Sequence, residues 1–507
     1  MKPINMFYAA GSLTPDAVAI DGPDGTLSYG ELRARVDALA AGLQGIDPAP
    51  QSRVGICGYN SLEHLTGLLA TMAAGKVWIP LNPRDAKEEL DAKLETAGPS
   101  ILILDEDCES KISPNAPHIV HGWGGSDTAS DSVAGLIAAN RGKIPEIHPL
   151  GPEDTQAIKF TGGSSGRPKG VLQPYCAWLT GAACMIHELG LSAADKYLLA
   201  APLTHGTSCY IMPTLGVGGT LVLGERTMRP AEILESFAAK DVTTTFIPPT
   251  VIYMMLAELG GEADFPALKR LIYGGAPMPP EKVRETRGVF GEVVATNYGQ
   301  TEAPQVATFL GPREMADDDL IASVGRASFL TRVAIMEPGS DKILPPDEDG
   351  EIVLSGGLVM TGYLNMPEAT AEVMQGDWLR TGDVGALDAR GYLYLKDRLR
   401  DVIISGGFNV YPSDVEAALV RHPVVNECIV YGIPDEKWGE AVQAAVVLRQ
   451  GANAGEQELI DFAKDTVGSV KAPKRIRLLE DLPRSSVGKV LRREVREAAL
   501  RDKTGQS

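Results

Sequence analysis

Short apolar runs rich in β-branched residues alternate with helical patterns through the first half of this 507-residue chain. Residues 54–57 and 77–81 are predicted strands, and residues 62–74 between them have the spacing of an amphipathic helix. Strands without a polar face must be covered on both sides, which is typical of parallel sheets. The same rhythm recurs at 100–104, 196–201, 220–223, 243–247 and 270–273. The pattern therefore predicts an α/β fold for the large N-terminal part, built from more than one sheet.

The pattern changes after about residue 325. Residues 350–354 and 391–395 are short predicted antiparallel strands between Gly and Asp turns, and a charged stretch follows at 396–401. Beyond it we expect a small α+β unit with helices and strands at 412–421, 427–432, 441–449 and 455–466. We place the boundary there: a large multi-subdomain α/β domain at 1–397 and a small mobile domain at 398–507.

Composition excludes several classes of protein. The formal net charge of −19 argues against nucleic acid as a partner. Six cysteines lie far apart without CxxC spacing, so neither a zinc site nor a disulfide framework is indicated. No apolar run is long enough to span a membrane, and no signal peptide is evident, so we expect a cytoplasmic protein. The basic stretch 471–501 either contacts a phosphorylated ligand or is a solvated face.

A loop at residues 160–170, Phe-Thr-Gly-Gly-Ser-Ser-Gly-Arg-Pro-Lys-Gly, follows an apolar strand. Small residues allow backbone N–H groups to converge on an anion, and Lys169 adds a positive charge. The loop is not a Walker motif, because Lys169 is followed by Gly170 rather than Ser or Thr. A flexible surface loop is the alternative, but the preceding strand and the basic residues favour phosphate binding.

This loop resembles the phosphate-binding signature of the adenylate-forming superfamily, which includes acyl-CoA synthetases, firefly luciferase and the adenylation domains of peptide synthetases. The loop departs from the usual form in carrying Gly162 where a Ser is common. Further segments match the family's motifs in the family's order, at 273–277, 297–302, 378–383, 397–401, 405–416 and 482–489. The resemblance therefore covers most of the chain.

The resemblance implies a site for ATP and Mg²⁺. Tyr298 would stack on adenine, Thr301 would contact the α-phosphate, Glu302 would hold Mg²⁺ and Asp383 would bind the ribose. The whole implied ATP set is Thr161, Gly163, Ser164, Ser165, Gly166, Lys169, Gly274, Gly275, Ala276, Asn297, Tyr298, Gly299, Thr301, Asp383 and Arg398.

The resemblance also assigns roles within the C-terminal part. Lys489 would bridge the acyl carboxylate and the α-phosphate, and Arg400 stands at the hinge position, where many relatives carry Asp or Lys. Gly406 and Gly407 would line the tunnel for the pantetheine arm of CoA. Lys471, Lys474 and Arg475 would contact the CoA phosphates, with a solvated face as the open alternative. The implied catalytic set is Lys489, Thr161, Lys169 and His205.

The acid-binding element resembles that of free-acid CoA ligases. Residues 202–208 read Pro-Leu-Thr-His-Gly-Thr-Ser and lack the Asp that amino-acid-activating relatives use. His205 would gate the acyl pocket or approach the carboxylate; a packed core histidine is the alternative. The implied pocket consists of His205, Tyr210, Ile211, Val251, Met254 and Gln305. It is mostly apolar, which favours an aliphatic or aromatic monocarboxylic acid over a malonate-like one.

Together these motifs predict an AMP-forming acyl-CoA synthetase that uses ATP, Mg²⁺ and CoA. The resemblance allows a homodimer. Two alternatives stay open at this point: a stand-alone adenylating enzyme that passes the acyl group to a carrier protein, and a catalytically silent ATP-fold binding protein. The silent alternative is disfavoured because the charged set Lys169, Glu302, Asp383 and Lys489 is complete.

Overall fold

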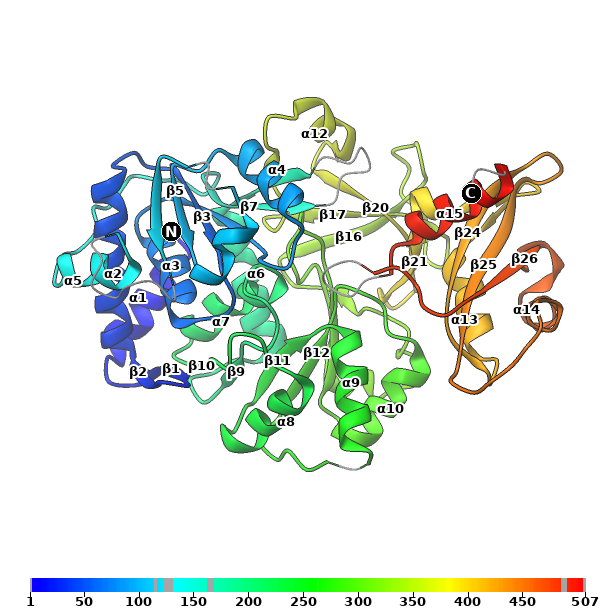
Figure 1. The fold of residues 1–507 in the computed structure, drawn as a ribbon, viewed down its shortest axis with the longest axis horizontal. Coiled ribbons are helices and arrows are strands. Elements are labelled where there is room, and N and C mark those ends of the chain that lie inside the picture. The colour runs from blue at the N-terminus through cyan, green and yellow to red at the C-terminus, as the bar shows by residue number, and fades with distance from the viewer. Residues whose placement is uncertain are drawn as a thin grey trace. The chain divides into compact units, whose positions relative to one another are not determined.

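The computed structural model describes residues 2–113, 116–122, 131–161, 168–261, 263–484 and 490–504 (Figure 1). The chain forms two compact units: the first comprises Met1–Val333 and Leu354–Arg380, and the second comprises Ala334–Val353 and Thr381–Ser507. Each unit is described separately below. The predicted boundary between residues 397 and 398 separates parts of the chain that are expected to move as rigid bodies. It remains a prediction.

A nine-stranded sheet forms one half of the first unit. Its order is β15-β14-β13-β12-β11-β9-β10-β1-β2. The central pairs from β13 to β1 are parallel, whereas the pairs at both ends are antiparallel. The strands are β1 Val18–Gly22, β2 Gly25–Ser28, β9 Lys196–Leu198, β10 Thr220–Val222, β11 Thr244–Ile247, β12 Arg270–Tyr273, β13 Val294–Tyr298, β14 Thr308–Leu310 and β15 Arg326–Ala327.

A seven-stranded sheet forms the other half, in the order β18-β8-β7-β4-β3-β5-β6. Strands β7, β4, β3, β5 and β6 are parallel, and β8 and β18 complete the edge as antiparallel strands. The strands are β3 Arg53–Cys57, β4 Val77–Leu81, β5 Ile101–Leu104, β6 His118–His121, β7 Thr155–Thr161, β8 Lys169–Pro174 and β18 Gly362–Tyr363. The prediction of more than one mostly parallel sheet is therefore confirmed.

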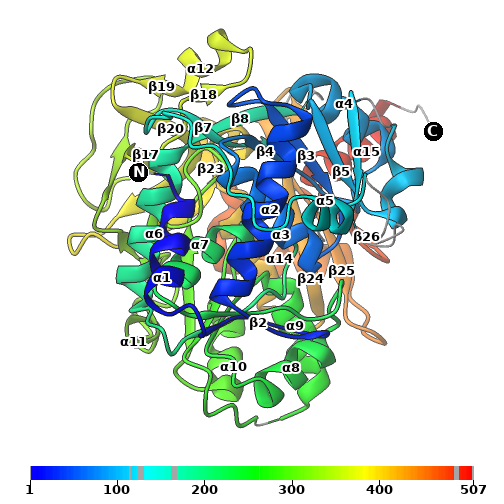
Figure 2. The same ribbon diagram turned by 90° about the vertical axis from the view of Figure 1, so that its left-hand side faces the viewer.

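Helices cover both faces of these sheets, as the apolar strands require (Figure 2). On β3, Val54 and Ile56 join one core, which contains residues of α2 and α3, whereas Cys57 joins another, which contains Leu90 and Leu94 of α4. The helices are α1 Ile4–Leu13, α2 Tyr29–Ile46, α3 Leu62–Ala73, α4 Lys87–Ala97, α5 Val133–Ala139, α6 Tyr175–Leu189, α7 Ile211–Gly216, α8 Pro230–Ala239, α9 Pro249–Leu259, α10 Pro280–Phe290, α11 Pro312–Met315 and α12 Pro367–Val373.

Serine side chains cap the N-termini of two of these helices, α2 and α3. Ser28 Oγ accepts the Glu31 N–H of α2 at 3.2 Å while the Glu31 carboxylate accepts the Ser28 N–H at 2.8 Å, which is a capping box. Ser61 Oγ accepts the His64 N–H of α3 at 3.0 Å. Each cap satisfies backbone donors that the helix itself leaves free.

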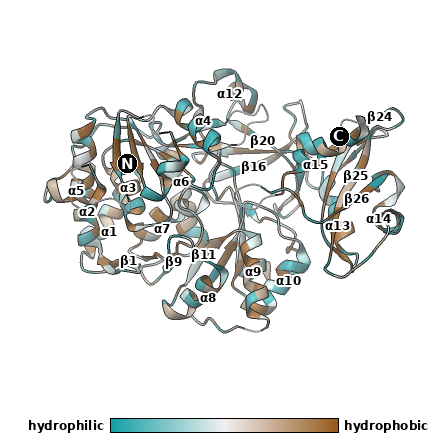
Figure 3. Cartoon of the chain, in the orientation of Figure 1, coloured by the Kyte–Doolittle hydropathy of each residue, from teal (hydrophilic) through white to brown (hydrophobic). Residues whose placement is uncertain are grey.

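The second unit contains a five-stranded sheet in the order β23-β22-β25-β24, with β26 parallel to β25. One face packs on α13 and α14, and the opposite face, with Ile429 and Tyr431, packs on α15. The strands around β25 are accordingly hydrophobic (Figure 3). The elements are β22 Ile403–Ser405, β23 Phe408–Val410, α13 Pro412–Val420, β24 Val425–Asp435, β25 Gly439–Leu448, α14 Glu456–Lys471, β26 Arg475–Leu479 and α15 Arg492–Thr504.

A further sheet has the order β16-β17-β20-β19, with β21 paired to β20. The boundaries between the two units fall within three of its strands, β16, β17 and β20. The strands are β16 Thr331–Met336, β17 Gly350–Gly356, β19 Met374–Gln375, β20 Trp378–Leu387 and β21 Leu393–Arg398. The predicted strands at 350–354 and 391–395 correspond to β17 and β21, and β21 begins two residues later than expected.

No helix among the described residues is long and apolar enough to cross a membrane. The same residues contain no cluster of three or more His, Cys, Asp or Glu side chains suited to a metal ion.

Candidate active site

Strands β7 and β8 hold the two ends of the predicted phosphate loop. They are antiparallel, and Thr161 pairs in register with Lys169. This pairing brings the Thr161 hydroxyl and the Lys169 ammonium to the mouth of one hairpin, as a phosphate cradle requires. The predicted loop residues Gly163, Ser164, Ser165 and Gly166 lie outside the described residues, so their contacts remain predictions.

Tyr363 connects Lys169 to Glu302. The Lys169 ammonium lies over the Tyr363 ring, 4.9 Å from its centroid, and the Tyr363 O–H donates to Glu302 Oε1 at 2.8 Å. Burial and the nearby Glu302 carboxylate raise the pKa of the Tyr363 phenol, so it stays a donor at neutral pH. Tyr363 was not predicted from the sequence, because no local motif marks it. It lies on the short strand β18, where it pairs with Val171 of β8.

The hydroxyl of Tyr363 orients the predicted metal ligand, and Tyr363→Phe tests this. The variant keeps the ring beneath Lys169 but leaves Glu302 Oε1 without that donor. One hydrogen bond of this kind contributes about 1 kcal/mol, so the Mg²⁺ concentration for half-maximal activity should rise roughly 2- to 10-fold. A magnesium titration of ATP–pyrophosphate exchange measures the shift. An unchanged titration would show that this hydrogen bond does not orient the metal ligand.

The predicted adenine element lies at the end of β13, beside the end of β12. Tyr273 of β12 pairs with Thr296 of β13, which brings residues 274–276 next to residues 297–302. Added Cβ atoms would lie 2.6 Å from Gln305 N at Gly299 and 2.6 Å from Asn297 Oδ1 at Gly274. Gly299 therefore permits a close backbone approach, whereas a side chain at Gly274 would displace the Asn297 amide. Gly275 and Ala276 are exposed, whereas Asn297 and Tyr298 are buried.

Aromatic rings stack beside this element. Tyr210 stacks on Tyr197 at 5.1 Å and on Phe246 at 5.5 Å, with interplanar angles of 11° and 23°. The Tyr210 hydroxyl accepts the side-chain amides of Asn297 at 2.7 Å and Gln305 at 3.4 Å. These two hydrogen bonds fix the Tyr210 ring, which lies in the middle of the stack. This cluster joins two predicted acyl-pocket residues, Tyr210 and Gln305, to an adenine-element residue, Asn297.

The other predicted acyl-pocket residues differ from Tyr210 and Gln305 in their surroundings and in their exposure to solvent. Ile211 is buried in the core, Val251 is half-buried on α9, and Met254 is 49% exposed. Gly206 lies against the aromatic stack, because a Cβ there would be 2.9 Å from Phe246 Cε1 and 2.6 Å from Gln305 Oε1.

His205 precedes this glycine, and its side chain is exposed to solvent. Its Nδ1 lies 2.8 Å from Thr204 Oγ1. Partial desolvation of the ring by the surrounding protein lowers the pKa of His205, and the Lys159 ammonium adds to the shift. The imidazole is therefore neutral at pH 7, which suits a group that lies beside an acid without forming an ion pair with it.

In the second unit the two predicted ribose contacts lie together. Asp383 of β20 pairs in register with Arg398 of β21, and Asp383 Oδ1 lies 2.7 Å from Arg398 Nε. The hinge candidate Arg400 is exposed and lies 3.9 Å from Asp401.

Arg492, which the sequence analysis missed, binds the hinge segment on both sides of Arg400. Its guanidinium contacts Asp397 at 3.0 Å and Asp401 at 3.1 Å, and it also contacts Glu416 of α13 at 2.8 Å. Three carboxylates around one guanidinium make a charge-assisted network. The network ties the hinge segment to α13 and to the start of α15.

Two of the predicted CoA residues, Gly406 and Lys474, lie against Trp438. Gly406 and Gly407 have φ of +60° and +83°, and a Cβ at Gly406 would lie 3.0 Å from the Trp438 ring. Lys437 and Lys474 lie over that ring, 4.9 and 5.1 Å from its centroid. Lys474 also donates to backbone carbonyls at 2.6 and 3.2 Å. Of the other two predicted contacts, Lys471 lies 3.2 Å from Asp414 and Arg475 is exposed.

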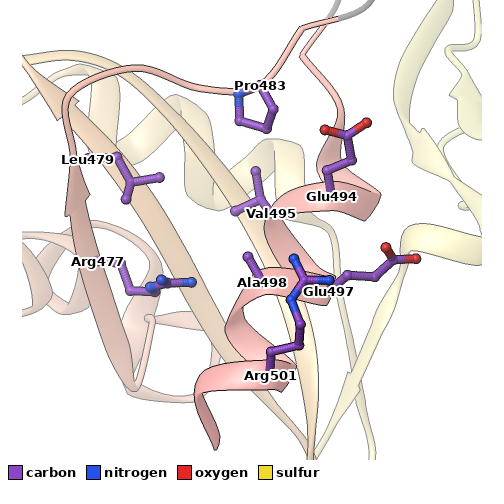
Figure 4. A pocket seen from close by; sticks show the side chains of 8 residues that line it. All are labelled: Arg477, Leu479, Pro483, Glu494, Val495, Glu497, Ala498 and Arg501. Atoms are coloured by element: carbon purple, nitrogen blue, oxygen red, sulfur yellow. The ribbon is translucent and has the colours of Figure 1, made fainter. Parts of the chain in front are cut away.

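The second unit also contains a cavity of about 540 Å³ between β26 and α15 (Figure 4). Its lining carries charges of both signs, and Arg477 lies 2.6 Å from Asp502. The lining residues are Arg477, Leu479, Pro483, Glu494, Val495, Glu497, Ala498 and Arg501. None of the predicted site residues is among them. Lys489 lies outside the described residues, so its role remains a prediction.

Comparison with known proteins agrees with this arrangement. Residues 7–364 match the AMP-binding enzyme family, and residues 414–489 match the AMP-binding enzyme C-terminal domain. The chain belongs to the AMP-binding enzymes. The match spans the phosphate, acid and adenine elements described above, and the predicted resemblance to adenylate-forming enzymes is confirmed.

Similar proteins extend over nearly the whole of this AMP-binding enzyme. A feruloyl-CoA synthase from Amycolatopsis is 35% identical over 490 residues, 96% of each chain. A medium/long-chain-fatty-acid–CoA ligase from Mycobacterium tuberculosis is 31% identical, covering 93% of this chain and 86% of its own. The structure of ATP-bound MatB from Rhodopseudomonas palustris superposes with a TM-score of 0.88 at 28% identity, covering 98% and 99% of the two chains. The predicted class, an AMP-forming acid–CoA ligase that uses ATP, Mg²⁺ and CoA, is thereby confirmed.

The described residues fit the magnesium ion that AMP-binding enzymes use. Mg²⁺ is normally held by one or two carboxylates together with substrate phosphates. Glu302 offers one carboxylate, already oriented by Tyr363, on the side of the hairpin where Lys169 lies. The ion would offset phosphate charge there.

Proposed function

We propose that this ligase activates an apolar monocarboxylic acid, preferably one with an aromatic ring, as its adenylate and then transfers the acyl group to CoA. The proposal rests on the stack of Tyr197, Tyr210 and Phe246 beside Gly206. Because Gly206 has no side chain, the acid-binding turn packs directly on these rings. A rigid apolar wall at the acid site favours a flat apolar substrate, because flat groups gain from offset stacking. The Tyr210 hydroxyl is already bound by two amides, so it does not need the substrate as a partner.

The names of similar proteins support the substrate class without fixing the acid. The feruloyl-CoA synthase acts on an aromatic acid, and an indoleacetate–CoA ligase from Aromatoleum aromaticum is 32% identical over 510 residues. The fatty-acid ligase from Mycobacterium tuberculosis is a similar protein named for aliphatic acids, which are the alternative substrates.

The roles of the site residues are part of the proposal. Thr161 and Lys169 bind the phosphates, Glu302 holds Mg²⁺, Tyr298 stacks on adenine, and Asp383 with Arg398 binds the ribose. Lys489 offsets the negative charge that develops when the acid attacks the α-phosphate. A neutral His205 beside the acid adds no competing positive charge.

The acceptor is proposed to be CoA because Trp438, Lys437 and Lys474 place an aromatic face and two cations beside the Gly406–Gly407 turn. Those groups suit a phosphorylated nucleotide thiol. A carrier protein and an amine are the alternative acceptors. A fatty acid–[acyl-carrier-protein] ligase from Streptomyces coeruleorubidus is 30% identical, and an amide bond synthetase from Marinactinospora thermotolerans has a TM-score of 0.87 at 29% identity.

A panel of acids tests the proposal. We expect pyrophosphate release with cinnamic and benzoic acids and with medium-chain fatty acids, with the largest kcat/KM for an aromatic acid and little release with malonate. Product analysis with CoA, with an acyl-carrier protein or with an amine alone then identifies the acceptor. A clear preference for malonate, or thioester formed only on the carrier protein, would contradict the proposal.

The cytoplasmic location, the homodimer and the division at residues 397 and 398 complete the proposal. The net charge of −19 suits an enzyme of the cytoplasm. The charged stretch 396–401 supports the division. The Arg492 network spans it, because Arg492 contacts Asp397 on one side and Asp401 on the other.

A further inference from the structure

Lys159 is a buried cation in the middle of β7, two residues before Thr161. Its side chain is 8% exposed. Among the residues that the structure describes, the ammonium has no carboxylate in ion-pair contact, and burial lowers its pKa. A buried charge without a counter-ion is costly, and an apolar residue would fill such a position more stably.

The ammonium binds the turn that carries His205. It donates to Ser208 Oγ at 2.8 Å and to the His205 carbonyl at 3.3 Å, and the Ser208 hydroxyl donates to the same carbonyl at 2.8 Å. Two donors therefore converge on one backbone carbonyl. The Trp78 and Trp178 rings flank the ammonium, with centroids 5.2 and 5.4 Å away.

One of these rings connects the lysine to the adenine element. Trp178 Nε1 donates to Gln173 Oε1 at 3.1 Å, and Gln173 Nε2 donates to the carbonyl of Thr301 at 2.7 Å. Thr301 directly precedes Glu302 in the chain. The surroundings of Lys159 thus reach three motifs that lie far apart in the sequence: the phosphate strand, the acid-binding turn and the adenine element.

We propose that Lys159 is a positioning residue, whose ammonium holds the His205 turn against strand β7 so that the bound acid faces the phosphate loop. This inference rests on the proposed function, because it takes the His205 turn as part of the acid site. Lys159 contacts neither ATP nor acid in this role. Its charge is kept in the interior because three donors on one flexible stem can clamp a turn that an apolar side chain cannot hold.

Lys76 provides a matched control. It is completely buried in the same unit, and it donates to the Asp47 and Ala49 carbonyls at 2.6 and 3.2 Å and to Ser52 Oγ at 2.6 Å. Burial lowers its pKa as well. Lys76 therefore binds backbone carbonyls and a serine hydroxyl, as Lys159 does. The loop that Lys76 holds, however, contains no predicted site residue.

The test compares K159M with K76M, using the best acid of the panel. K159M should raise the KM for the acid roughly tenfold or more, change the KM for ATP much less, and leave the melting temperature no lower than that of the wild type. K76M should leave both KM values unchanged. S208A, which keeps the lysine but removes its acceptor, should raise the acid KM in the same direction. The double variant K159M/S208A should show less than the sum of the two effects.

Several results would overturn the inference. One is an unchanged acid KM in both K159M and S208A. Another is a parallel rise of the acid and ATP KM values with a lower melting temperature, which would make Lys159 only a structural residue. A third is an effect confined to acids with a second carboxylate, which would make Lys159 a substrate ligand. Failure of the proposed function is distinguishable, since it would appear in the wild type as the absence of acid-dependent pyrophosphate release.

Discussion

Lys489→Ala should lower the rate of adenylate formation roughly 10²–10³-fold, which is the loss expected for one preorganised electrostatic donor. Two anions, the acyl carboxylate and the α-phosphate, repel each other as they approach, and an ammonium between them offsets that repulsion. Thioester formation from a supplied acyl-adenylate should survive, because in the adenylate the carboxylate is already bonded to the α-phosphate and pyrophosphate has already left. Pyrophosphate exchange measures the first step, and thioester formation from synthetic adenylate measures the second.

The control for this variant is Lys464→Ala. Lys464 lies on α14 of the same unit, is 41% exposed, and forms a surface ion pair with Asp461 at 3.1 Å. Surface pairs of this kind contribute little to stability, so both half-reactions should stay at the wild-type rate. An equal loss of the two steps in Lys489→Ala would assign the lysine to general folding or to nucleotide binding instead.

Much of the fold could be predicted because strand and helix periods are local properties of the sequence. Residues 270–273 form β12 as predicted, and residues 77–81 form β4. The ends of strands were predicted less accurately. The strand expected at 196–201 ends at Leu198, where the chain turns toward the acid-binding element. Antiparallel edges such as β8 were not predicted, because strand order depends on contacts between distant segments rather than on local pattern.

The parts of the site that escaped prediction are contacts across the sequence. Tyr363 meets Lys169 and Glu302 through three separate segments, and Arg492 gathers carboxylates from positions 397, 401 and 416. Lys159 was missed because it lies in a strand recognised by its apolar neighbours. A lone charge in such a strand carries no spacing that would identify its partners. Motif order could predict which residues form the site, but only the structure shows which side chains hold them in place.

Gly407→Leu should stop thioester formation while adenylate still accumulates. Gly407 has φ of +83°, and no atom lies within 4 Å of a Cβ built there. A leucine would therefore extend into open space beside the Gly406–Trp438 contact rather than clash with the protein. If that space admits the pantetheine arm, the side chain blocks it, and misplacement of the thiol should lower the second step roughly 10²-fold or more.

Backbone strain must be separated from blocking, and Gly451→Leu does this. Gly451 lies in the same unit with φ of +77° and likewise has no atom within 4 Å of an added Cβ. A left-handed conformation costs about 1–2 kcal/mol for a residue with a side chain, so both variants should lose similar stability. Only Gly407→Leu should lose thioester formation from preformed adenylate. The appearance of acyl-CoA measures this step. If it keeps the wild-type rate, or if Gly451→Leu loses as much, the glycines at 406 and 407 serve only as a turn, and the acyl-transfer tunnel lies elsewhere.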